Sequence, residues 1–257
     1  MKRLIALAML LPVAALAKSP FDGTWMTKID SIKISAKPDV FELNNGMYDC
    51  SSCVPAYKIK ADGSEQPVPG HDYVDHESVK IVNATTVEFT DKKAGKLIQT
   101  TTMMVSADGS KLTGKFTNYT GEKPITGGFS EKRVGPAAAG AHALSGSWQQ
   151  DTMSDMSDLA RTVKLQSTDN GLKVMWNGQV LDAKFDGKDY AWTNDPGNTM
   201  SALKKISDSQ IEETDHRGGK VTDVTLFTVS ADGKWITAVD TDQVHASKTT
   251  SMMEKQP

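Results

Sequence analysis

The chain contains the segment Val105-Ser106-Ala107-Asp108-Gly109 and repeats it 124 residues later as Val229-Ser230-Ala231-Asp232-Gly233. The same offset relates Val87-Glu88-Phe89-Thr90-Asp91 to Ile211-Glu212-Glu213-Thr214-Asp215. Landmarks that keep one spacing along a chain are the sequence signature of an internal repeat. The sequence therefore predicts two copies of one module.

A Gly-x-Trp tripeptide opens each copy, as Gly23-Thr24-Trp25 and as Gly146-Ser147-Trp148. Between the copies, residues 135–143 consist mostly of Ala and Gly, a composition typical of a flexible linker. We therefore expect a first barrel repeat at 18–134 and a second at 144–257. A linker of this kind favours separate closure of the two modules.

Each copy is expected to be antiparallel β-structure. Residues 85–90, 96–106 and 111–119 are rich in Thr, Val, Ile and aromatic side chains. Asp108-Gly109 lies between two of these runs, and Asp-Gly there is a strong tight-turn signal. The fold class predicted is all-β, with two tandem antiparallel meander barrels. A short helix is also expected within residues 151–161.

The N-terminus has the pattern of an export signal. Lys2 and Arg3 precede an apolar run that ends in Ala15-Leu16-Ala17, and small residues at these positions suit signal peptidase. The run is too short to span a bilayer, which takes about 20 apolar residues. We expect residues 1–17 to be a signal peptide cleaved after Ala17, and the mature protein to be periplasmic or secreted.

The composition excludes several classes of protein. The net charge is −3, and it becomes −5 once Lys2 and Arg3 are removed. A mildly acidic chain without a basic stripe argues against nucleic-acid binding. No second apolar run suits a membrane span, and no catalytic triad, acid/base pair or phosphate loop stands in a supporting context. We expect a monomeric protein that is not an enzyme and carries no cofactor.

The opening and closing segments of each copy resemble those of the lipocalin-like (calycin) superfamily. Gly23 with Trp25, and Gly146 with Trp148, match the family's Gly-x-Trp. Basic residues stand near the end of each copy, at Lys132 or Arg133 and at Lys255. The resemblance implies barrels of eight to ten strands, with the Trp at the closed end and a cation across its ring. It also implies a small apolar or amphipathic ligand in one or both barrels.

Cys50 and Cys53 are the only cysteines, and they belong to the first copy alone. In an exported chain a local disulfide is the favoured interpretation. A thiol-redox role and a metal site remain alternatives, because two thiolates are half of a tetrahedral set. His71 is the candidate third ligand of such a site, whereas solvated loop histidines are the simpler interpretation.

Four residues are candidates for contact with a ligand at the barrel interior or mouth: Met103, Phe227, Met153 and Met156. Three functional hypotheses follow. The first is a binding protein for a small apolar or amphipathic ligand. The second is a non-enzymatic structural or interaction protein of the cell envelope. The third is a thiol or metal protein built on the cysteine pair.

Overall fold

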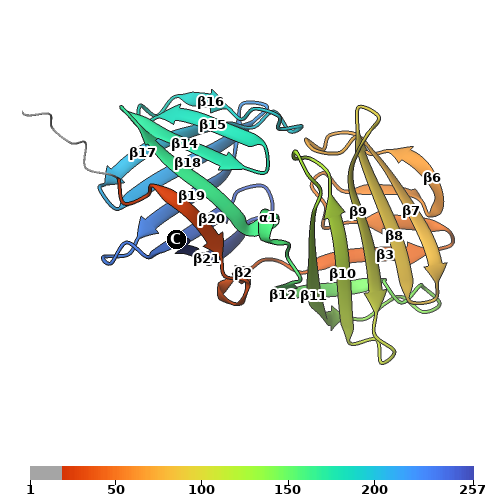
Figure 1. Ribbon diagram of the computed structural model, residues 1–257. Helices are drawn as coiled ribbons and strands as arrows, with labels where there is room; N and C mark the ends of the chain where they lie inside the picture. Colours follow the sequence, from red (N-terminus) through yellow and green to blue (C-terminus); the bar gives the residue numbers. More distant parts are fainter. Residues whose placement is uncertain (1–18) are drawn as a thin grey trace, which may run out of the picture.

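The protein is described by a computed structural model that covers residues 19–257. The predicted signal peptide, residues 1–17, lies outside the described residues. The described chain forms two nearly closed antiparallel β-barrels of ten strands each, which lie side by side (Figure 1). The all-β class and the two barrels are thus confirmed. None of the helices in residues 19–257 is long and apolar enough to cross a membrane.

Barrel I is the barrel formed by residues 39–154. Its strands are hydrogen-bonded in the order β5-β4-β3-β12-β11-β10-β9-β8-β7-β6. Its strand bounds are β3 (Asp39–Asn44), β4 (Met47–Cys50), β5 (Tyr57–Lys60), β6 (Asp62–Pro67), β7 (His76–Asn83), β8 (Thr86–Lys93), β9 (Lys96–Val105), β10 (Lys111–Asn118), β11 (Ile125–Gly135) and β12 (Gly146–Ser154).

Barrel II has the order β15-β14-β13-β1-β21-β20-β19-β18-β17-β16, and β2 pairs with β21 beside this path. A 3-10 turn η1 (Ile29–Ser31) joins β1 to β2 within this barrel, and the short helix α1 (Asp158–Arg161) lies in a segment that connects the two barrels. The strand bounds are β1 (Gly23–Thr27), β2 (Lys33–Ser35), β13 (Thr162–Thr168), β14 (Gly171–Trp176), β15 (Gln179–Lys184), β16 (Asp189–Ala191), β17 (Met200–Ser207), β18 (Gln210–Arg217), β19 (Lys220–Val229), β20 (Trp235–Asp242) and β21 (Ser247–Lys255).

The two copies of the repeat exchange their first strands. β1 comes from the first copy, yet it pairs with β13 and β21 of barrel II. β12 opens the second copy, yet it pairs with β11 and β3 of barrel I. In Figure 1 the red N-terminal strand accordingly lies in the barrel coloured green to blue, and green β12 lies with the orange and yellow strands.

The barrels therefore do not coincide with the expected repeats at 18–134 and 144–257. Barrel I is one continuous stretch from Asp39 to Ser154, and barrel II is assembled from the chain on both sides of it. The chain crosses between the barrels in residues 36–38 and 155–161. Separate closure of each copy was the wrong expectation, because a Gly-x-Trp strand matches the open edge of either copy.

Residues 135–143 are not a linker between the barrels. They belong to the loop that joins β11 to β12 within barrel I, and this loop folds back across the end of that barrel. His142 donates its backbone N–H to Leu43 O at 2.9 Å, and its Nε2 lies 2.7 Å from Asn83 O. Leu144, which follows, is 1% exposed. A small-residue composition indicated flexibility, but backbone hydrogen bonds and the buried leucine fix the loop.

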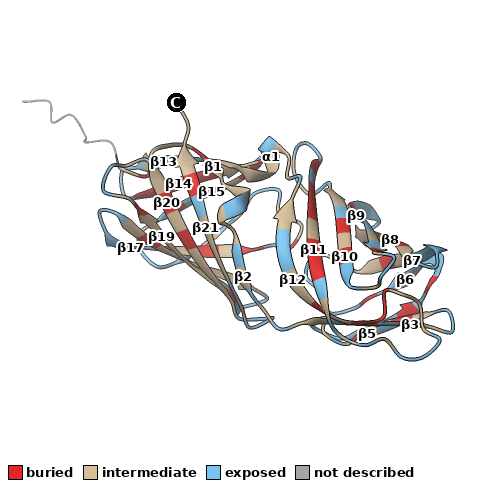
Figure 2. Ribbon diagram, turned by 90° about the horizontal axis from the view of Figure 1, so that it is seen from below, coloured by how far each residue is buried: buried red, intermediate tan, exposed pale blue. Residues whose placement is uncertain are grey.

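The barrel cores follow from the two-residue alternation of the strands. Along β10, buried Leu112 and Gly114 alternate with more exposed neighbours, a pattern visible in Figure 2. Between β9 and β10, Gly109 has φ 71°, and Gly233 in the corresponding turn has φ 68°. Both predicted turns thus use the positive φ that glycine tolerates. The helix expected in 151–161 is limited to α1, since β12 continues to Ser154.

Candidate functional site

A tryptophan and a cation close one end of each barrel. Arg133 on β11 lies over the Trp148 ring, with 4.0 Å from its Cζ to the ring centroid. Lys255 on β21 lies over the Trp25 ring with 5.0 Å from its Nζ to the centroid. Both tryptophans are 0% exposed, and each indole N–H donates to a backbone carbonyl four residues earlier. Of the two basic residues suggested for the first copy, Arg133 is the one on the ring.

The glycine of Gly-x-Trp makes room for that cation. A Cβ on Gly146 would lie 2.4 Å from Arg133 Nη1, and a Cβ on Gly23 would lie 2.8 Å from Lys255 Cε. The two glycines also have φ values of 129° and 140°, which L-residues rarely adopt. The tripeptide and the cation are therefore one structural unit. This unit is architecture and offers no open site.

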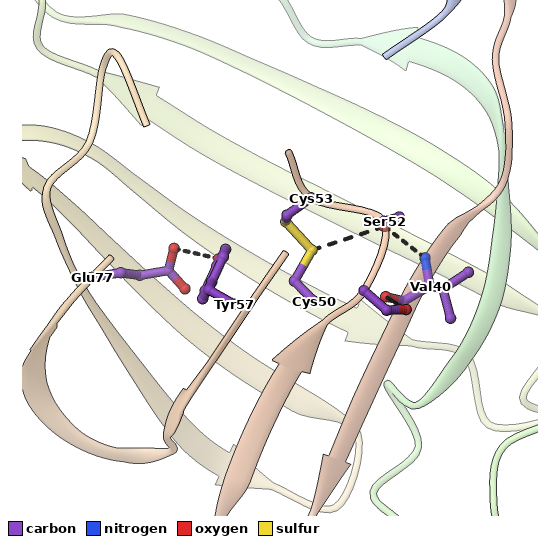
Figure 3. The surroundings of a disulfide bond; sticks show 7 residues. Val40, Cys50, Ser52, Cys53, Tyr57 and Glu77 are labelled. Atoms are coloured by element: carbon purple, nitrogen blue, oxygen red, sulfur yellow. Dashed lines mark hydrogen bonds between the residues drawn. A yellow bond between two sulfur atoms is a disulfide. The ribbon is translucent and has the colours of Figure 1, made fainter. Parts of the chain in front are cut away.

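Cys50 and Cys53 form a disulfide at the end of β4, as Figure 3 shows. Cys50 is 0% exposed and belongs to the core of barrel I. Ser52 Oγ, within the disulfide loop, accepts a 2.9 Å hydrogen bond from the backbone N–H of Val40. Because both sulfurs are bonded to each other, the pair cannot supply thiolates to the metal site considered with His71. Residues 19–257 contain no group of three or more His, Cys, Asp or Glu placed to hold a metal ion.

The proposed ligand contacts do not meet in one place. Phe227 lines a cavity of about 70 Å³ inside barrel II, together with apolar side chains and Glu213. Met103 packs against the core of barrel I. Met153 lies on β12 and Met156 just after it, and neither lines this cavity or the two hollows described below. Drug-sized ligands need about 300–1,000 Å³, so neither barrel core holds such a molecule as it stands.

A larger cavity lies between the barrels. It has a volume of about 380 Å³, and a second hollow of about 140 Å³ adjoins it and shares four of its lining residues. The walls are formed by Tyr73, Val74, Asp91, Ile98, Gln99, Asn118 and Thr120 from barrel I, and by Trp176, Gln179, Trp192, Asp195, Thr199, Asp215 and Arg217 from barrel II.

Close contacts hold the barrels together beside this cavity. Asn177, in the β14–β15 turn, donates its side-chain amide to Lys123 O at 2.8 Å and accepts the Glu122 N–H at 2.8 Å on its own carbonyl. A Cβ on Gly121 would lie 2.1 Å from Asn177 Nδ2, and a Cβ on Gly178 would lie 2.6 Å from Glu122 Cβ. The two surfaces are thus fitted to each other, and the walls of the cavity are fixed.

Barrel I places a pair of carboxyl groups at the cavity. Asp91 on β8 continues the inward series of Val87 and Phe89, and it lies directly opposite Glu77 on β7. Tyr57 donates its hydroxyl to Glu77 Oε2 at 2.8 Å (Figure 3). The other oxygen of Glu77, Oε1, and Asp91 Oδ1 are both buried without a partner.

Burial, together with the neighbouring charge, raises the pKa of Glu77, and burial also raises the pKa of Asp91. A single proton between the two carboxyl groups would satisfy both of the unpartnered oxygens. We therefore treat Glu77 and Asp91 as one proton-sharing pair near neutral pH.

Barrel II also has a pair of buried carboxyl groups, but both lie on one strand and not on two neighbouring strands. Asp215 on β18 is the counterpart of Asp91, and Ser201, at the position of Glu77, donates its hydroxyl to Asp215 Oδ1. The second carboxyl group is Glu213, two residues before Asp215 and on the same face of β18. Burial and the adjacent carboxylate raise the pKa of Glu213, and burial raises that of Asp215.

Arg217 is the one basic side chain in the cavity wall described above. Its Nη2 lies 3.2 Å from Asp223 Oδ2, its Nε donates to Thr199 Oγ1 at 3.1 Å, and its Cζ lies 5.0 Å from the Tyr73 ring centroid. Tyr73 belongs to barrel I, so this contact also crosses between the barrels. The positive charge of Arg217 is thus largely neutralised by its ion pair with Asp223.

Glu131 is a further buried carboxyl group, away from the cavity on β11. It is 5% exposed, and its Oε2 has no hydrogen-bond partner. Burial, with Asp39 nearby, raises the pKa of Glu131 to about 7. The ionisation of Glu131 therefore affects the free energy of unfolding.

The inter-barrel cavity was missed in the sequence, although one signal for it was present. Asp91 and Asp215 recur at the same offset of 124, and each stands where strand alternation places a core side chain. Repeated carboxylates at inward positions therefore mark the cavity. Trp176 and Trp192 gave no such signal.

No protein-family model, curated protein or solved structure matches this chain.

Proposed function

We propose that this protein is an exported, lipocalin-like binding protein, without enzymatic activity, that holds a small amphipathic molecule between its two barrels. The observation that carries this proposal is the cavity of about 380 Å³, which has the size of a small-molecule site. Aromatic and aliphatic walls supply apolar contact area, and a few polar groups supply orientation. The disulfide and the signal-like N-terminus support export.

This ligand position differs from the one that the resemblance implies, which is the interior of one or both barrels. The barrel cores are filled by their own side chains, and the cavity of about 70 Å³ in barrel II holds only a few atoms. A site shared by two barrels requires them to keep a fixed relative position. The interlocked contacts of Asn177 and the exchanged strands provide that fixed position.

A cavity-filling variant tests the proposal. Thr120→Trp places an indole in the cavity wall, and Tyr119→Trp is the matched control because Tyr119 is 37% exposed and does not line the cavity. The probe is N-phenyl-1-naphthylamine, a neutral aromatic molecule whose fluorescence rises in apolar surroundings. We expect the parent protein and Tyr119→Trp to bind it alike, and Thr120→Trp to bind it at least tenfold more weakly. Equal binding by all three proteins would contradict the proposed site.

Packed barrel interiors also favour a second candidate function, that of a structural or interaction protein of the cell envelope. Native mass spectrometry of the protein purified from its own cells distinguishes the two. A binding protein releases a small molecule on denaturation, whereas an interaction protein shows the same mass before and after.

A further inference from the structure

We propose that the inter-barrel cavity selects a ligand whose polar end is an organic ammonium cation. This inference rests on the proposed function and names the chemical class that the same site would take. Three features of the wall carry it: its charge, its aromatic surfaces and the state of its hydrogen-bond donors.

The wall is acidic. Asp91, Asp195 and Asp215 line the cavity, and Arg217 is the single opposing charge. Arg217 is paired with Asp223, which lies outside the lining. An anionic ligand would therefore meet an excess of carboxyl groups, whose charge repels its own. A cation meets opposite charges there.

The indoles of the wall and its side-chain amides donate to protein acceptors. Trp176 Nε1 donates to Ala160 O at 3.1 Å, and Trp192 Nε1 donates to Ser201 Oγ at 2.7 Å. The side-chain amides of Gln99, Asn118 and Gln179 likewise donate to Thr101 Oγ1, Gln99 Oε1 and Asn194 O. By contrast, Asp91 Oδ1 accepts no hydrogen bond from the protein apart from the proton that it shares with Glu77. A ligand that donates hydrogen bonds suits this wall, and an ammonium group offers up to three donors and no acceptor.

The aromatic walls fit the same chemistry. A cation near an aromatic face is stabilised by the ring quadrupole. The protein already uses this contact here, because the Arg217 guanidinium lies 5.0 Å from the centre of the Tyr73 ring. Trp176 and Trp192 have their N–H groups turned to protein acceptors, which leaves their ring carbons to the ligand. An ammonium group can also replace the proton that Asp91 shares with Glu77, so that the two carboxylates keep a compensating positive charge.

Three probes of one shape test the inference: 4-phenylbutylammonium, neutral 4-phenylbutanol and anionic 4-phenylbutyrate. Each is titrated into the purified full-length protein at pH 7.5, with tryptophan fluorescence and calorimetry as readouts. We expect the ammonium to bind at least tenfold more tightly than the alcohol, and the carboxylate to bind most weakly. Alcohol binding as tight as ammonium binding would overturn the inference while leaving the proposed function intact. Absence of binding by all three probes would overturn both.

Substitutions of the aspartates in the cavity wall test where the ammonium group binds. Asp91→Asn and Asp215→Asn each remove a carboxylate without changing its shape, and each should weaken ammonium binding at least tenfold more than it weakens alcohol binding. Retained alcohol binding also shows that the variant is folded. Glu88→Gln is the matched control, because Glu88 lies on β8 with Asp91 but pairs with exposed Lys80 at 3.2 Å. Ammonium affinity unaffected by both aspartate substitutions would place the cation elsewhere and overturn the inference.

Discussion

Arg133 lies over Trp148, 4.0 Å from the ring centroid, although the two residues belong to different copies of the repeat. The same holds for Lys255 and Trp25 in the other barrel. Each closed end is therefore completed by a strand that the other copy supplies. The contacts of Arg133 extend beyond the ring, because its guanidinium also donates to the carbonyls of Gly109, Ala143 and Ser145 at 2.6–2.7 Å.

Arg133→Met should strongly destabilise the protein. It removes the cation over the indole and leaves three half-buried carbonyls without their charged donor, so we expect a loss of roughly 2–4 kcal/mol. Urea unfolding followed by tryptophan fluorescence measures this loss. Lys132→Met is the control, since Lys132 is exposed and makes one surface ion pair with Asp151, and its change should stay within about 0.5 kcal/mol. Equal effects of the two substitutions would show that the ring contact is unimportant.

A fragment of residues 36–157 should fold by itself. It contains every strand of barrel I, including β12, and Trp148 is its one tryptophan. We expect blue-shifted emission and a cooperative urea transition. The repeat-based fragment 18–134 has Trp25 as its one tryptophan, lacks β12 and carries an unpaired β1, so its emission should be that of an exposed indole. Cooperative folding of fragment 18–134 would contradict the need for strand exchange.

The strands and turns of this fold were accessible from the sequence, whereas the exchange was not. Runs of β-formers and the Asp108-Gly109 turn are local signals, and they predicted β9 and β10 to within about one residue at each end. Strand exchange leaves every local signal unchanged, because Trp25 and Trp148 make the same kind of contact in either barrel. The choice between the two closures depends on the connecting segments 36–38 and 155–161.

The candidate site was less predictable for a related physical reason. Its walls come from loops and strand ends of both barrels, and their meeting depends on how the barrels are placed. Tyr73 and Trp192 stand in segments with no repeated pattern. Met103 suits a core position, and its polarizable side chain packs against the core of barrel I.

The stability of the folded protein should fall as the pH rises through the pKa of Glu131. Its pKa is about 7 in the folded protein and near 4.5 when unfolded, so the folded state holds more protons between these values. The cost is absent below about pH 4.5 and fully present above about pH 7. Glu131→Gln should therefore be more stable than the parent at pH 8, by about 1–3 kcal/mol, and similar to it at pH 4.5.

Thermal or urea unfolding at both pH values checks this prediction. The raised pKa values of Glu77 and Glu213 act in the same direction, so some pH dependence should remain in the variant. An equal stability difference at pH 4.5 and pH 8 would mean that the substitution acts through packing and not through the proton.

Replacing both cysteines, as Cys50→Ser with Cys53→Ser, should cost about 2 kcal/mol, because the bridge closes a loop of only four residues. Zinc and copper content, measured by mass spectrometry of the purified proteins, should be the same with and without the cysteines. Metal lost on substitution would revive a thiolate site. Ser51→Ala, inside the same loop, controls for the change of side chain.

The exchanged strands also determine how assembly responds to dilution. Two single-copy chains could build this pair of barrels only by colliding, and the product would dissociate at low concentration. In the tandem chain, residues 36–38 and 155–161 deliver each donor strand at an effective concentration on the order of mM, whatever the amount of protein in solution. Proteolytic cleavage within both segments would remove that advantage, and barrel II would then retain β1 only through its contacts with β13 and β21.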